Sequence, residues 1–81
     1  MKILKFYAEW CGPCKMLTKT LEGYNEVEIQ EIDIDQDQET AIKYMIRGVP
    51  TLVLVDDSGN EIRRKAGMMM FNEFEKFVKG E

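Results

Sequence analysis

Short apolar or alternating segments predict four strands along the chain. They cover residues 2 to 7, 27 to 34, 52 to 55 and 61 to 66. The third segment is wholly apolar, as in a strand buried on both faces, whereas the fourth alternates, as in an edge strand. The cluster from Asp56 to Asn60 between them is rich in turn-forming residues. We therefore expect the last two strands to form a hairpin.

Helical spacing of apolar residues predicts three helices between and after these strands. The first covers about residues 12 to 22 and ends at Gly23, and its inner face holds Cys14, Leu17 and Leu21. The second covers about 38 to 46, with Asp37 as its N-terminal cap and Gly48 ending it. On the last two helices, the residues expected to face inward are Ala41, Ile42, Met45, Ile46, Phe71, Phe74, Phe77 and Val78. The resulting order is βαβαββα, and its first βαβ unit is expected to be a right-handed parallel crossover.

The only two cysteines lie in the segment Trp10-Cys11-Gly12-Pro13-Cys14, between the first strand and the first helix. Proline is favoured at the first position of a helix, so Cys11 is expected at the helix N-terminus. Free amides and the positive end of the helix dipole stabilise a thiolate there. Cys14 lies about one turn further in, on the side expected to be shielded. This spacing predicts dithiol exchange, in which Cys11 attacks a disulfide and Cys14 resolves the mixed disulfide.

Other uses of this cysteine pair fit the sequence less well. A structural zinc site takes four ligands, usually Cys and His, and the chain has two cysteines and no histidine. A purely structural disulfide across two residues would close a very small loop and so gain little stability.

The acidic segment from 33 to 39 does not match a calcium-binding loop, because Gln38 and Tyr44 occupy the positions where glycine and glutamate are needed. We expect no metal and no cofactor.

Length and charge narrow the class of protein further. The chain has 81 residues and a formal net charge of -4, which predicts one domain over residues 1 to 81 and argues against a nucleic-acid surface. No long apolar stretch or cleavage site marks it for export or membrane insertion, so a cytoplasmic location is expected. In that compartment a Cys-X-X-Cys motif is more often redox-active than structural.

Three segments resemble thioredoxins, in the order expected for that family. Residues 8 to 15, around the two cysteines, resemble the thioredoxin active-site segment, and 34 to 36 and 46 to 51 resemble two further stretches. The resemblance implies an α/β, thioredoxin-like fold with a four-stranded mixed sheet in the order 2-1-3-4 and three helices. Ordinary thioredoxins carry an extra strand and helix before their first active-site strand. The chain is thus expected to be a minimal, glutaredoxin-sized thioredoxin-like protein lacking that pair.

The resemblance also implies a substrate surface beside the cysteines. The Val49-Pro50 peptide bond would be cis, which would turn the backbone of Val49 outward to pair with an extended substrate. Trp10, Gly67 and Met68 would line the same surface. Trp10 and Gly67 each have an ordinary alternative, partial core burial and a strand end, whereas Met68 is expected as a flexible residue at the rim of the surface.

The function implied is that of a protein disulfide reductase. Gly12 and Pro13, between the cysteines, resemble the reducing members of the family. The partners expected are disulfide-containing proteins and a thioredoxin reductase-like electron donor, with the chain acting as a monomer. Two alternatives remain open: a glutathione-dependent, glutaredoxin-like reductase, suggested by size alone, and a non-enzymatic binding or processivity subunit.

Lys5 departs from the family pattern. It is the lone charge between Ile3 and Ala8, a segment otherwise fit for burial, and a buried lysine needs a partner. Thioredoxins commonly have a buried acid at this position and a lysine on the neighbouring strand, where alignment places Glu31. The charges are therefore expected to be swapped and to meet. Because a charged lysine cannot accept a proton, Glu31, acting through water, is the candidate base for Cys14. The alternative is that Lys5 reaches solvent and Glu31 is an ordinary surface charge.

Overall fold

The computed structural model describes residues 1–81 and has the predicted order of elements. In chain order the elements are β1 (Lys2–Tyr7), α1 (Gly12–Thr20), β2 (Glu28–Asp33), α2 (Gln38–Lys43), β3 (Thr51–Val55), β4 (Glu61–Ala66) and α3 (Phe71–Lys79). The four strands form one sheet in the order β2-β1-β3-β4, as the resemblance implied. β1 runs parallel to β2 and antiparallel to β3, and β3 and β4 form the predicted antiparallel hairpin.

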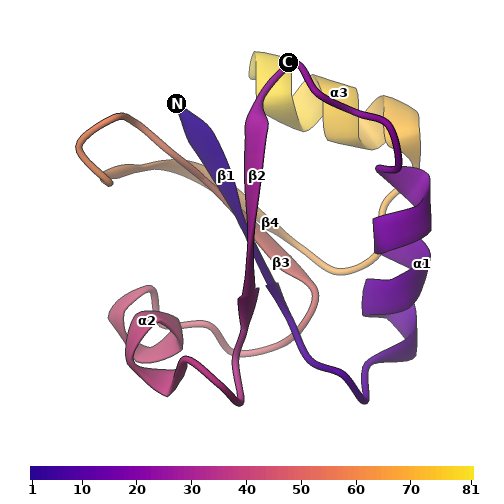
Figure 1. Ribbon diagram of the computed structural model, residues 1–81. Helices are drawn as coiled ribbons and strands as arrows, with labels where there is room; N and C mark the ends of the chain where they lie inside the picture. The colour runs from indigo at the N-terminus through magenta and orange to yellow at the C-terminus, as the bar shows by residue number, and fades with distance from the viewer.

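The helices cover both faces of the sheet. α1 and α3 lie on one side and α2 lies on the other (Figure 1). Side chains alternate along a strand, so the central strand β1 supplies a core to each side. Ile3 packs with Leu17 of α1 and Phe74 of α3, whereas Leu4 and Phe6 belong to the cluster that α2 covers. Lys5 follows Ile3 in this alternation and therefore faces α1.

A few residues at each end determine where α1 starts and stops. Cys11 is the N-cap and Pro13 lies in the first turn, as the motif predicted. The helix ends at Thr20, earlier than residue 22, and Gly23 lies in the following turn with a φ of 82°. On the inner face Cys14 and Leu17 are buried, and Leu21, the C-cap, is buried after them. This face fixes the helix N-terminus above the end of β1.

The prediction that Ile42 and Met45 pack inward is wrong. The side chains of these two residues are 74% and 70% exposed. α2 has six residues and packs on the sheet through the face that holds Ala41 and Tyr44, three positions apart, so Ile42 lies off that face. Met45, with a φ of 52°, and not Gly48, ends the helix by entering the left-handed region. This turns the chain so that the backbone N–H of Ile46 donates to the carbonyl of Ala41 at 2.9 Å.

The predicted N-cap of α2 is present, and two of the aromatic residues predicted to face inward on α3 are buried. Asp37 is the N-cap of α2 and accepts hydrogen bonds from the amide and hydroxyl of Thr40, which hold the pKa of its carboxyl below its ordinary value. On α3, Phe74 and Phe77 are buried. The prediction that Phe71 faces inward is wrong: this residue lies in the first turn of α3, is exposed and meets the ring of Tyr24 edge-on.

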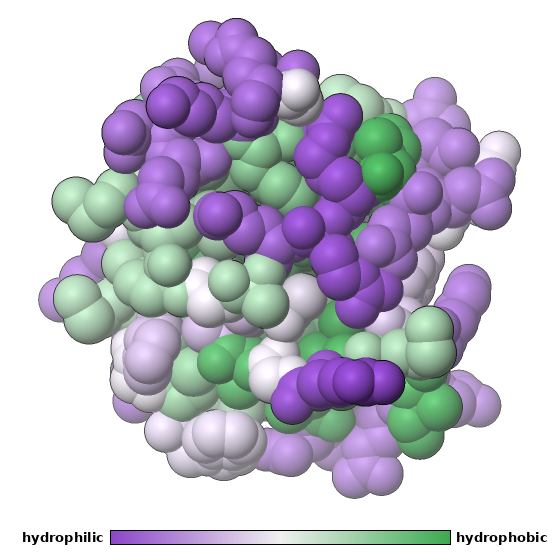
Figure 2. All heavy atoms as spheres, turned by 180° about the vertical axis from the view of Figure 1, so that it is seen from behind, coloured by the Kyte–Doolittle hydropathy of each residue, from purple (hydrophilic) through white to green (hydrophobic).

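Polar and apolar residues are unevenly distributed over the surface. Seen from behind, hydrophilic residues cover most of the upper part of the molecule (Figure 2). Apolar side chains come to the surface mainly in the lower part, the end where α2 and the start of α1 lie in Figure 1. Among the exposed apolar residues are Trp10, Ile42, Met45, Met68 and Met70. No helix is long and apolar enough to span a bilayer.

Phe74→Ala should test the core between the sheet and α3. Phe74 is fully buried, so its truncation leaves a cavity and should lower the free energy of unfolding by about 3 to 5 kcal/mol. The matched control is Phe71→Ala on the same helix, which should cost about 1 kcal/mol because that ring is exposed. Urea unfolding measures both, and equal losses would contradict the assigned packing.

Candidate active site

The two cysteines are joined by a disulfide at the N-terminus of α1. Their Cα atoms are 5.3 Å apart, and the disulfide makes this the oxidised form. As the N-cap residue, Cys11 has extended backbone angles, and its Sγ accepts the backbone N–H of Cys14 at 3.1 Å. An amide of the first helical turn thus points at the sulfur, where negative charge on Cys11 would be stabilised.

Both cysteines are covered in this oxidised form. Cys11 is 4% and Cys14 2% exposed. They form a small cluster with Ala8, against which Tyr7, Ile34 and Val49 pack. Cys14 is shielded as predicted, but exposure alone does not distinguish the two sulfurs here.

The loop before β3 lies against Cys11. The Val49-Pro50 peptide bond is cis, and the carbonyl oxygen of Val49 lies 3.6 Å from Cys11 Sγ. The backbone N–H of Gly67 donates to the carbonyl of Pro50 at 2.8 Å. Gly67 has a φ of 91°, which favours glycine, and the partly exposed Met68 follows it. The structure therefore brings Val49, Pro50 and Gly67 together next to the disulfide.

Trp10 lies on the surface rather than in the core. Its side chain is exposed, and its indole Nε1 donates to the Asp35 carboxylate at 3.0 Å. The backbone N–H of Asp35 in turn donates to Asp33 at 2.9 Å. Sequence reasoning did not find Asp35 as the partner of Trp10. The available signal was its place in the 34 to 36 stretch that resembles thioredoxins.

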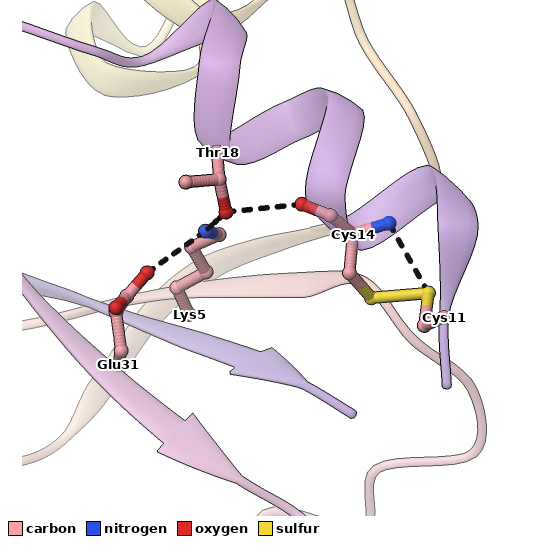
Figure 3. A network of polar contacts seen from close by, with 5 residues as sticks. All are labelled: Lys5, Cys11, Cys14, Thr18 and Glu31. Carbon is pink, nitrogen blue, oxygen red and sulfur yellow. Dashed lines mark hydrogen bonds and ion pairs between the residues drawn. A yellow bond between two sulfur atoms is a disulfide. The ribbon is translucent and has the colours of Figure 1, made fainter. Parts of the chain in front are cut away.

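Beneath α1, Lys5 is bound between two acceptors. Its Nζ lies 3.0 Å from Glu31 Oε1 and also donates to Thr18 Oγ1 (Figure 3). The Thr18 hydroxyl donates to the carbonyl oxygen of Cys14 at 3.1 Å. The Lys5 side chain is 3% exposed and that of Glu31 53%. Lys5 therefore does not reach solvent, and the pair spans from the buried interior to the surface.

Thr18 is the member of this network that sequence reasoning missed. It follows Cys14 by four residues, so the two lie on neighbouring turns of one helix. That spacing was the signal, but a threonine on a helix commonly bonds the carbonyl four residues before it. Nothing in the sequence showed that Lys5 would donate to the same hydroxyl.

A cavity of about 440 Å³ opens beside Cys14. It is lined by Tyr7, Ala8, Glu9, Cys14, Lys15, Thr18, Lys19, Glu22 and Glu31. Burial raises the pKa of the Tyr7 phenol, and the carboxylates of Asp33, Glu9 and Glu31 raise it further. Tyr7 is therefore neutral around pH 7. No group of three or more His, Cys, Asp or Glu side chains lies close enough to hold a metal ion.

Known proteins are similar to this chain in sequence and in fold. The family model described as Thioredoxin matches residues 1–80. A thioredoxin from Chlamydia trachomatis is 43% identical over 70 residues, which cover 82% of this chain and 68% of that protein. The SPbeta prophage-derived thioredoxin-like protein YosR of Bacillus subtilis is 33% identical over 79 residues and covers 98% of this chain and 96% of its own.

A solved structure is also similar to this chain. A mutant thioredoxin from Halobacterium salinarum superposes with a TM-score of 0.86 and 34% identity, covering 96% of this chain and 71% of its own. With a cysteine pair joined at the N-terminus of α1, the chain belongs to the thioredoxin family and is a dithiol–disulfide oxidoreductase.

Proposed function

We propose that Cys11 is the nucleophile and Cys14 the resolving thiol of a protein disulfide reductase. The observation that carries this assignment is the hydrogen bond from the backbone N–H of Cys14 to Cys11 Sγ. In the reduced protein the same amide would stabilise a thiolate on Cys11. No such amide donates to the sulfur of Cys14.

The exchange runs in two balanced steps. The Cys11 thiolate attacks one sulfur of a target disulfide, forming a mixed disulfide and releasing the other target sulfur as a thiolate. Cys14, as a thiolate, then attacks Cys11 Sγ, so that the Cys11–target bond breaks and the Cys11–Cys14 disulfide forms. The target gains two electrons and the protein loses two. The short distance between the cysteines favours the second step, because attack within one molecule avoids the entropy of a new encounter.

The substrate surface is proposed to consist of Trp10, Val49, Pro50, Gly67 and Met68. Val49 lies beside Cys11 and Gly67 is bonded to Pro50, which supports a groove that runs past the sulfur. An extended peptide could bond to the backbone of Val49, as in strand addition. The exposed indole of Trp10 and thioether of Met68 offer apolar contact on either side.

Proteins of this family generally reduce disulfide substrates with electrons from thioredoxin reductase. For this chain we propose disulfide-containing proteins as substrates, a thioredoxin reductase-like donor, and action as a monomer in the cytoplasm. Gly12 and Pro13 between the cysteines support the reducing direction.

Insulin reduction tests the proposed activity and its donor. The protein should turn over with a thioredoxin reductase and NADPH, and only slowly with glutathione and its reductase. Cys11→Ser should abolish turnover, whereas Cys14→Ser should trap a mixed disulfide with insulin that mass spectrometry detects. Faster turnover with glutathione would favour the glutaredoxin-like alternative. Turnover with neither donor would favour a binding role.

Met68→Ala tests the proposed substrate surface. Loss of its contact should raise KM for a protein substrate by about two- to fivefold while kcat stays unchanged, because the contact serves binding rather than chemistry. Met70→Ala is the matched control, since Met70 is also an exposed methionine of the same segment and should leave KM unchanged. Steady-state insulin reduction measures both variants, and an equal effect would remove Met68 from the surface.

A further inference from the structure

The one buried charge near the cysteines is a cation. Lys5 faces α1 from β1, and its Nζ donates to Thr18 Oγ1 and to Glu31. The Thr18 hydroxyl already gives its hydrogen to the carbonyl of Cys14, so it presents lone pairs to Lys5. An amine that faces a carboxylate and a hydroxyl oxygen is held as an ammonium ion.

This ammonium lies close to Cys14. A single hydroxyl oxygen separates it from the Cys14 carbonyl (Figure 3). Two hydrogen bonds in series span at most about 6 Å. Glu31 lies on the other side of Lys5 from Cys14, and its side chain is half exposed. Lys5 is thus linked through Thr18 to the backbone carbonyl of Cys14 and lies between Cys14 and Glu31.

The other charges around Cys14 are less effective than Lys5. The titratable groups that line the cavity beside it lie on all the elements that meet there: Tyr7 on β1, Glu9 in the following loop, Lys15 and Lys19 on α1, Glu22 after it, and Glu31 on β2. Lys15, Lys19, Glu9 and Glu22 are exposed and Tyr7 is neutral, so water screens the charged members of this group. Lys5 is covered, and a charge acts more strongly through a low dielectric.

We propose that Lys5 stabilises the thiolate of Cys14 and thereby prepares the resolving step without a general base. Thr18 and Glu31 hold the ammonium in place beneath α1. A cation favours the ionised form of an acid, so Cys14 releases its proton to solvent water and exists as the attacking thiolate at a lower pH than it would without Lys5. In this account the carboxylate of Glu31 is the counter-ion of Lys5 and does not receive the Cys14 proton. The inference rests on the proposed role of Cys14 as the resolving thiol.

The test is a pH titration of Cys14 in the Cys11→Ser protein, where Cys14 is the only thiol. The ultraviolet absorbance of the thiolate gives its titration midpoint. Adding Lys5→Met should raise the midpoint by about one pH unit, a tenfold change in the ionisation equilibrium. Lys5→Arg keeps the charge and should restore the midpoint. An unchanged midpoint in Lys5→Met, or an equal rise in Lys5→Arg, would overturn the proposal.

Lys2→Met is the matched control. Lys2 lies on the same strand, donates to Gln30 of β2 at 2.8 Å, and loses the same unit charge when replaced. It is three residues away, about 10 Å along the strand, and should leave the midpoint unchanged. Lys5→Met is expected to fold, because replacing a buried ion by an apolar side chain of similar volume is often neutral and Glu31 can be solvated. Thermal unfolding of each variant verifies this.

The double variant Lys5→Met with Glu31→Gln separates the cation from a base. It leaves no unpaired buried charge, so the two hypotheses can be compared directly. If Glu31 is only a counter-ion, adding Glu31→Gln to Lys5→Met should neither raise the midpoint further nor slow resolution of a mixed disulfide. A further slowing would show that Glu31 accepts the proton. The titration needs no turnover, so its outcome is independent of the insulin reduction assay.

Discussion

The hydrogen bond from the backbone N–H of Cys14 to Cys11 Sγ is the contact on which the site depends. It exists because Cys11 is an N-cap, and an N-cap side chain receives one of the unpaired amides of the first helical turn. Packing fixes the position of this first turn of α1, since Leu17 is buried against Ile3 of β1 and Phe74 of α3. The core of the sheet therefore positions Cys11 Sγ at the positive end of the helix dipole.

The space between β1 and α1 is apolar at one end and ionic at the other. Near Ile3 it is filled by aliphatic and aromatic side chains, and near the cysteines it contains Lys5. Burial of a charge is costly unless hydrogen bonds and a counter-charge compensate it. Thr18 and Glu31 supply both, and Lys5 lies between Glu31 and Cys14. The fold thus tolerates a buried cation at this site because one side of the network opens to water at Glu31.

Much of the fold could be predicted from local sequence patterns. The strand before the cysteines, the cap at Asp37 and the hairpin around Asp56 to Asn60 each follow from the identity of a few neighbouring residues. The strand order 2-1-3-4 came from the resemblance to thioredoxins, because local periodicity does not order strands. The end of α2 was not predictable, since a left-handed methionine is rare and Gly48 was the conventional choice. Met45 is exposed because it lies beyond that early end, and Ile42 is exposed because it lies off the helix face that holds Ala41 and Tyr44.

The cysteine motif and the opposed charges at Lys5 and Glu31 could be read from the sequence through spacing, alternation and alignment. The partners contributed by distant residues could not. Asp35 reaches Trp10, and Thr18 reaches Lys5, only once β1, β2 and α1 are packed together. Polar side chains on helices and loops have many possible partners, and the sequence does not choose among them.

The most direct measurement is the rate at which iodoacetamide alkylates each thiol of the reduced protein as a function of pH, with the modified cysteine identified by peptide mapping. The account predicts that Cys11 reacts first and stays reactive at a pH where free cysteine is largely protonated, while Cys14 is protected by burial. Equal and slow modification of both thiols, with the pH dependence of free cysteine, would contradict it.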